Sequence, residues 1–275
     1  MSEINSIIVR CLNHNRCDST LNGELYMNSL HHFLKNCNMS QSDYFEGAAY
    51  RLPISEMPFS EDFKKSLEGE YIYGLPVGFK YLHVYCFSRL ETKVDGSFLS
   101  FKCPSDEQFR EFGDRCLVIK DPEELFRRIL NECNKLRYKV FIGKVTYMNV
   151  PSRGNVLLKT ENSGDLFADK TMNVTPFIKG KDHETEMEFR ILVLPDSNIA
   201  GPIKLHIGSI KDIAYVSHIK TNNGLSIKNS AKKYNIKMIR SDYVLSNCDL
   251  SEMCLEAFHR GNRETMGFFR FLPKE

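Results

Sequence analysis

The sequence predicts an α+β protein with a single mixed, largely antiparallel β-rich core and peripheral helices. Segments with strand character outnumber those with helical periodicity, and the two kinds do not alternate regularly as they would around a parallel sheet. No low-complexity linker, long charge block or repeat divides the 275 residues. We therefore expect one domain over residues 1–275, with a motif-bearing core at about 7–194 and C-terminal strands and a helix, 195–275, packed on it.

The first half contains short apolar or alternating segments bounded by turn residues, which predict strands. These segments are residues 6–12, 24–28, 81–88, 97–102 and 115–120. A turn is expected at residues 19–23 and a short helix over residues 29–37. Proline and glycine recur between residues 51 and 78, which predicts a loop with one helical turn over residues 61–67.

The clearest helical pattern runs from Asp121 to Arg137. Asp121 suits the N-cap and Pro122 the first helical position. An apolar stripe predicts a core-facing side, and its members are Leu125, Ile129, Cys133 and Leu136. Further elements are expected downstream: strands at residues 138–148, 186–194, 204–216 and 236–240, and a helix at 251–260 that ends at Gly261.

Composition is that of an ordinary globular protein, with 42% hydrophobic and 26% charged residues. The formal net charge is only +2, so no overall field attracts a polyanionic partner, and nucleic acid is neither implied nor excluded. Nine cysteines without C-x-x-C pairs and an N-terminus without a signal-peptide pattern favour reduced thiols in a cytoplasmic protein. No apolar run reaches the ~20 residues that cross a bilayer.

One group of residues invites a test for metal binding: Cys11, His14 and Cys17, with His31 and His32 downstream. Zinc sites usually add a second close pair of ligands at a recognisable spacing. The sequence contains no such pair, so we expect no metal at this group.

The segment from His183 to Pro195 carries the strongest chemical pattern. Read at strand period, Glu186, Glu188 and Arg190 project to one face of the sheet. Two carboxylates held this close repel each other, which raises the pKa of one. Such a pair is suited to binding a cation or a sugar hydroxyl, or to transferring a proton. The alternative is a salt-bridged outer face on an edge strand, where Arg190 neutralises both acids.

Several familiar signatures are absent from the chain. It contains no G-x-x-x-x-G-K-S/T, G-x-G-x-x-G, H-E-x-x-H or G-x-S-x-G motif. Their absence removes the commonest nucleotide hydrolases, dinucleotide dehydrogenases, zinc proteases and serine hydrolases.

Three short pieces each lie on or follow a predicted strand: residues 9–10, 86–88 and 186–190. In this order they resemble the ADP-ribosyltransferase superfamily. Its members carry an Arg or His on the first strand, a Ser or Tyr after the second, and a Glu on a later strand. Taken singly, a strand-borne Arg also fits an edge charge, and a Ser after a strand also fits a turn.

A longer resemblance links the chain to a bacterial family that carries a domain of unknown function. That family shows G-x-L-Y-x-x-S, an acidic-aromatic stretch, C-F-S, a G-x-C-L-x-F-like strand, and F-x-x-K followed by E-x-E-[WYF]-R. The corresponding pieces are residues 23–29, 43–46, 86–88, 114–119 and 186–190. The family's M-W-x-x-Y is replaced by residues 109–112. The layout is also similar, more loosely, to DarT-like and CmdT-like toxins, which modify nucleic acid.

The resemblance implies an ADP-ribosyltransferase-like fold and a glycosyltransferase that uses NAD as substrate. Glu188 would be the principal catalytic residue, stabilising the oxocarbenium ion as the nicotinamide bond breaks, and Glu186 its acceptor-side partner. Arg10 would hold a pyrophosphate or ribose oxygen. Ser88 would bond the nicotinamide ribose or support Glu188. Tyr44 would stack on the nicotinamide, unless it is plain core.

The same resemblance implies a toxin or phage-defence effector in the cytoplasm, acting on nucleic acid or protein, partnered by an antitoxin or chaperone, with no membrane. Two alternatives stay open. One is a nucleotide-binding regulatory module without turnover. The other is a metal-dependent nuclease with its Mg²⁺ ligands drawn from an acidic set: Asp43, Glu46, Glu186 and Glu188.

The acceptor surface has one candidate in the sequence. Lysine and arginine concentrate at Lys135 to Lys144 and at Lys228 to Arg240, with tyrosines in or beside them at 138, 147 and 234. Basic groups interleaved with aromatic rings suit single-stranded nucleic acid, whereas charge runs are also common as solvated faces.

Overall fold

The computed structural model is a mixed α+β structure with a largely antiparallel sheet, as the sequence predicts. It describes residues 4–35, 50–53, 55, 60–66, 71–75, 77–95, 98–102, 113, 115–148, 172–218, 235–240, 242–262 and 268–271. None of the described helices is long and apolar enough to cross a membrane.

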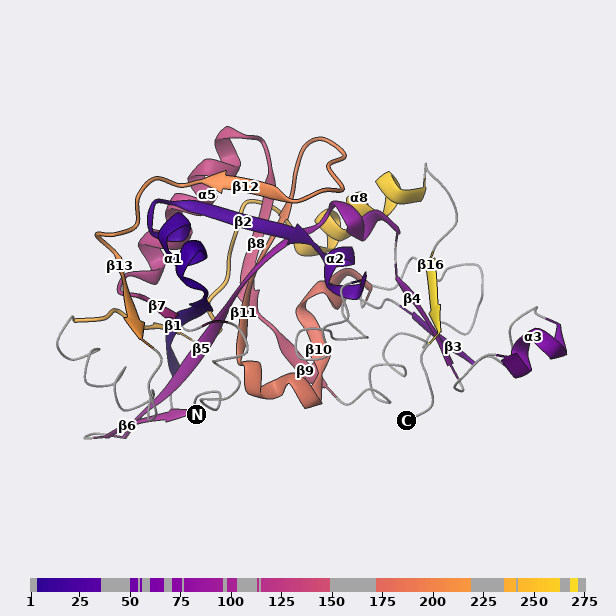
Figure 1. The fold of residues 1–275 in the computed structure, drawn as a ribbon, viewed down its shortest axis with the longest axis horizontal. Helices are drawn as coiled ribbons and strands as arrows, with labels where there is room; N and C mark the ends of the chain where they lie inside the picture. Colours follow the sequence, from indigo (N-terminus) through magenta and orange to yellow (C-terminus); the bar gives the residue numbers. More distant parts are fainter. Residues whose placement is uncertain are drawn as a thin grey trace.

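The main sheet has the order β13-β7-β1-β5-β11-β8-β15, and every pairing along this path is antiparallel. The seven strands are β13 (Ala214–His218), β7 (Arg115–Ile119), β1 (Ile4–Leu12), β5 (His83–Asp95), β11 (Glu188–Leu194), β8 (Lys139–Lys144) and β15 (Leu245–Ser246). Four more strands join it: β2 (Glu24–Ser29), β6 (Phe98–Lys102), β12 (Ile203–His206) and β14 (Ile239–Arg240). Strand β5 is the long central member that crosses the sheet in Figure 1.

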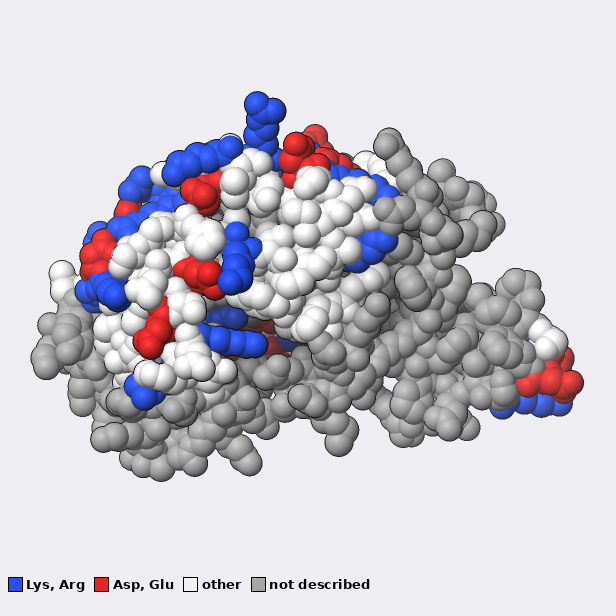
Figure 2. All heavy atoms as spheres, turned by 45° about the horizontal axis from the view of Figure 1, so that its top comes forward, with Lys and Arg blue, Asp and Glu red and all other residues white. Residues whose placement is uncertain are grey.

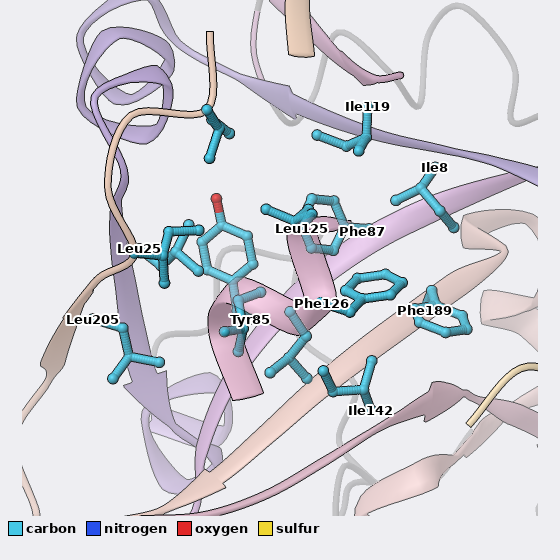
Figure 3. Packing of buried hydrophobic residues seen from close by; sticks show 14 of the residues in the cluster. Ile8, Leu25, Tyr85, Phe87, Ile119, Leu125, Phe126, Ile142, Phe189 and Leu205 are labelled. Atoms are coloured by element: carbon cyan, nitrogen blue, oxygen red, sulfur yellow. The ribbon is translucent and has the colours of Figure 1, made fainter. Parts of the chain in front are cut away.

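One face of the sheet is covered by α5 (Pro122–Lys135). The Asp121 side chain caps this helix by accepting a hydrogen bond from the Glu124 backbone, as predicted. Its buried stripe packs on aromatic residues of the strands, and the Phe126 and Phe189 rings stack at 5.3 Å (Figure 3). This is the largest of the three described apolar clusters, and it makes α5 part of the core.

The opposite face carries two apolar clusters separated along the strands. One joins β5 and β11 to α2 (Leu30–Lys35), α8 (Leu250–Asn262) and the 3₁₀ segments η2 (Val77–Tyr81) and η3 (Met172–Phe177). The other joins β1 and β7 around Ile7 and Val9. Because Phe87 and Phe189 face α5, their neighbours Ser88 and Glu188 face this second side.

The sheet forks beside the middle of β5. Strand β1 pairs with β5 only as far as Val9 opposite Ser88, and beyond that row it continues on β7 alone. Strand β2 rejoins β5 at Val84. Between these two pairings, residues 85–87 of β5 have no strand partner on that side among the described residues.

Two expectations about the N-terminal third need correction. Residues 14–21 form helix α1 (His14–Leu21), capped by the Asn13 side chain, so the turn expected at residues 19–23 is confined to residues 22–23. The described residues between 51 and 78 include two strands where a loop was expected: β3 (Tyr50–Pro53) pairs with β4 (Tyr71–Leu75), and β4 pairs with β16 (Phe268–Phe271), in a separate sheet. Figure 1 shows this sheet set apart from the main one, with α3 (Glu61–Ser66) beyond it.

The predicted strand over residues 186–194 begins two residues late. Residues Lys181–Glu186 form a 3₁₀ turn, η4, and Met187 adopts a left-handed backbone with φ of 49° before β11 starts at Glu188. The Met187 carbonyl accepts a hydrogen bond from the Arg89 backbone, which fixes this bend. Strand β11 is also central and fully buried, so the alternative of an exposed edge strand is wrong.

Candidate active site

The candidate active site is a cavity of about 240 Å³ at the fork of the sheet. Strands β1, β2, β5 and β11 supply most of its lining. Four predicted site residues line it together: Arg10, Ser88, Glu186 and Glu188. The fifth, Tyr44, lies outside the described residues.

Glu188 is the most enclosed of these groups, with 4% of its surface exposed. Its Oε1 accepts a hydrogen bond of 2.6 Å from Arg190 Nε, and its Oε2 one of 3.2 Å from Lys179 Nζ. Its backbone N–H donates to the hydroxyl of Tyr147 at 2.7 Å. Burial alone would raise the pKa of this carboxyl, but Arg190 and Lys179 outweigh burial and hold the pKa well below its usual range.

Glu186 ends η4 rather than lying on the strand, yet its carboxylate still meets that of Glu188. Lys179 Nζ bridges the two, at 2.6 Å from Glu186 Oε2, and His183 Nδ1 lies 2.8 Å from Glu186 Oε1. Burial opposes ionisation here too, but Lys179 and His183 lower the Glu186 pKa. The expectation that repulsion raises one carboxyl's pKa is therefore wrong, because a cation stands between the two acids.

Arg10 approaches the cavity where β1 leaves β5. Its guanidinium donates to the carbonyl of Cys86, one of the β5 groups without a strand partner at the fork, and its Cζ lies 3.6 Å from the centroid of the Tyr85 ring. Its Nε has no hydrogen-bond partner among the described residues. Arg10 therefore closes the fork on one side and presents a cation to the cavity on the other.

Ser88 lies directly opposite Glu188 in the β5–β11 register. Residues opposed in an antiparallel pair project to the same face with their Cβ atoms about 4.5–5.5 Å apart. The half-buried Ser88 hydroxyl is thus placed beside the carboxylate, at the same row where β1 leaves β5.

Sequence reasoning missed two groups that contact the acidic residues: Lys179, which bonds both carboxylates, and Tyr147, which bonds the Glu188 backbone. They lie opposite each other on a small parallel ribbon of β9 (Thr146–Met148) and β10 (Ile178–Gly180). The resemblance stated from the sequence includes an F-x-x-K before E-x-E, which would have pointed to a lysine in this segment. Here the spacing is one residue shorter, Phe177-Ile178-Lys179.

Metal binding finds no support in the described part of the chain. No group of three or more His, Cys, Asp or Glu side chains there could hold an ion. The Lys179 ammonium already fills the space between Glu186 and Glu188, where a bridging cation would sit. The other acids of the nuclease alternative, Asp43 and Glu46, lie outside the described residues.

The two basic stretches come near each other at one point in the described residues, because Asp242, which pairs with Arg240, is also attracted by Lys144. Strands β11, β5 and β1 separate β8 from β14 in the sheet. Four of their basic side chains are paired with acids: Lys135 with Glu132, Lys139 with Glu256, Lys237 with Asp121 and Arg240 with Asp242. Figure 2 shows basic and acidic side chains interspersed on one face of the molecule. Residues 228–234 lie outside the described ranges.

No protein-family model, curated protein or solved structure matches the chain. Function must therefore be argued from the geometry and charge of the site itself.

Proposed function

We propose that the protein is an NAD-dependent ADP-ribosyltransferase of the cytoplasm that modifies nucleic acid or a protein. The observation that carries this proposal is the meeting of Arg10, Ser88 and Glu188 at one cavity. They come from three adjacent strands, in the order that the sequence resemblance requires.

The charge of the cavity suits a pyrophosphate. Four cationic side chains line it against two carboxylates, which leaves an excess of two positive charges: Arg10, Arg16, Lys179 and Arg190 against Glu186 and Glu188. A pyrophosphate diester carries two negative charges, and guanidinium groups bind it through paired hydrogen bonds. The volume is below the ~300–1,000 Å³ of sites that enclose a drug-sized ligand, so the cavity would enclose one nucleotide half of NAD.

The two carboxylates suit different parts of the transfer. Glu188 stays ionised and would stabilise positive charge on the ribose as the C1–nitrogen bond breaks and its electron pair returns to the nicotinamide ring. The acceptor then attacks C1 and loses its proton. Glu186, hydrogen-bonded to His183, would orient the acceptor and receive that proton.

One observation favours a second function, a nucleotide-binding regulatory module without turnover. Both oxygens of Glu188 already accept hydrogen bonds from cations, Arg190 and Lys179. A carboxylate neutralised in this way would stabilise an oxocarbenium ion less than a free one. Such a module would bind NAD and release no nicotinamide.

The deciding experiment compares the wild-type chain with Glu188→Gln and Glu256→Gln. Glu256 is a matched control on α8, because it also pairs with two cations, Lys139 and Arg260. We expect NAD binding by calorimetry in all three proteins and nicotinamide release in the wild type and the control. Release should fall about 100-fold or more in Glu188→Gln.

Each other outcome has a defined meaning. Binding without release by the wild type would replace the transferase with the regulatory module. Absence of both binding and release at millimolar NAD would refute both functions. With labelled NAD, nucleic acid and lysate, label removed by nuclease identifies a nucleic-acid acceptor, and label removed by protease identifies a protein acceptor.

A further inference from the structure

Lys179 is the least expected member of the site. It lies at the middle of β10, and its side chain is only 6% exposed. Its Nζ is 2.6 Å from Glu186 Oε2 and 3.2 Å from Glu188 Oε2. One buried ammonium thus connects two carboxylates that belong to different elements, a 3₁₀ turn and a strand.

The remaining neighbours cannot substitute for this bridge. Arg190 bonds Glu188 through Oε1, and His183 bonds Glu186 through Oε1. From β5 and β9, Cys86 and Tyr147 face Glu188 as neutral groups, because burial raises the pKa of each above its ordinary value. From β1, Arg10 lines the same cavity and bonds the Cys86 carbonyl.

Removal of the ammonium would bring two negative charges together in a desolvated site. Arg190 would still bond Glu188 and His183 would still bond Glu186, but the repulsion between the two carboxylates would raise the pKa of one of them, so that it holds a proton over a wider pH range. The site would then lose either the charge that stabilises the ribose or the group that receives the acceptor's proton.

We propose that Lys179 is a positioning residue that keeps Glu186 and Glu188 ionised and aligned toward one reacting centre. The inference rests on the proposed transferase function for its kinetic consequence. Its electrostatic part concerns the two carboxylates alone and is tested without NAD.

The kinetic test measures nicotinamide release from pH 5 to 9 for the wild type, Lys179→Met, Lys179→Arg and Lys204→Met. Lys204 is the control, since it also forms a lysine–glutamate pair, with Glu24 at 3.1 Å, but on the surface. In Lys179→Met the low-pH side of the rate profile should shift to higher pH by at least about one unit. The rate of nicotinamide release would then be roughly tenfold lower on that side and would recover at pH 9. Lys179→Arg should keep the low-pH side of the wild type, and Lys204→Met the whole wild-type profile.

The electrostatic test follows the carboxyl carbons of Glu186 and Glu188 by ¹³C NMR in the absence of NAD. We expect both groups to titrate below the ordinary range of a glutamate in the wild type, and one of them to titrate at a clearly higher pH in Lys179→Met. If Lys179→Met fails to fold, Lys179→Gln serves the same purpose, because its amide group can donate hydrogen bonds and carries no charge.

The results separate the two proposals. A rate lowered by the same factor at every pH, or carboxyl titrations that match the wild type, would overturn the role of Lys179. His183 is present in both proteins, so the difference between the two profiles isolates the effect of the lysine. A wild type that releases no nicotinamide refutes the transferase, while the NMR titration still decides whether Lys179 keeps both acids ionised.

Discussion

Replacement of Glu188 by glutamine should cost substantial stability as well as activity. The side chain lies in a buried cluster, where Arg190 Nε is 2.6 Å and Lys179 Nζ 3.2 Å from its oxygens. Glutamine has nearly the same volume, so little packing is lost, but two buried cations lose half of their compensating charge. Breaking a buried ion pair by removal of one partner costs about 3–5 kcal/mol. We expect a loss in this range at pH 7, measured by urea unfolding with an unchanged m-value.

The stability difference between the wild type and Glu188→Gln should depend on pH in a defined direction. The Glu188 pKa is lower in the folded protein than in the unfolded chain, so its charge stabilises the fold above the unfolded pKa of about 4.3. That contribution is lost as pH falls toward the folded value. The difference in unfolding free energy between wild type and Glu188→Gln should therefore be constant from pH 6 to 8 and shrink below about pH 4. A difference under about 1 kcal/mol at pH 7 would refute the buried cluster.

Two further predictions test the fold that supports the site. Phe189→Ala should lower the unfolding free energy by about 3–5 kcal/mol, since the ring is fully buried and stacks on Phe126; a loss below about 2 kcal/mol in urea unfolding would contradict that packing. Gly23→Ala should be severely destabilising, because the backbone has φ of 90° and a Cβ would lie 2.0 Å from the Gly208 carbonyl oxygen, whereas Gly201→Ala has open space; equal melting temperatures for the two variants would show the close approach to be absent.

Local signals predicted some elements well because their determinants lie within a few residues. Helix α5 has its cap, first-turn proline and apolar stripe in one segment, and it was predicted nearly to its ends. Helix α1 was missed because its sequence is mostly polar, and only two of its residues are buried. The β4–β16 pairing brings Tyr73 opposite Arg270, a separation that no local pattern reports.

The residues of the candidate site also fall into those that local sequence predicted and those that it did not. Residue type and order placed Arg10, Ser88 and Glu188 at one cavity, because the strands that bear them have clear patterns. The start of β11 was misplaced because the left-handed turn at Met187 depends on a hydrogen bond from Arg89, about a hundred residues away. Lys179 was missed for a related reason: the β9–β10 ribbon that positions it pairs Tyr147 with Lys179, about thirty residues apart in the sequence.

The site and the core are two sides of the same strands. Ser88 and Glu188 face the cavity, while their chain neighbours Phe87 and Phe189 face α5. A side chain one residue from a close-packed aromatic cluster can move little, because its backbone is fixed by the core. Groups on strands are also positioned more precisely than groups on loops. The same anchoring makes the chemistry intolerant of drift in the core. A substitution that tilts β11 by repacking Phe189 would misalign Ser88 and Glu188. This misalignment would lower activity under conditions where the protein is still folded.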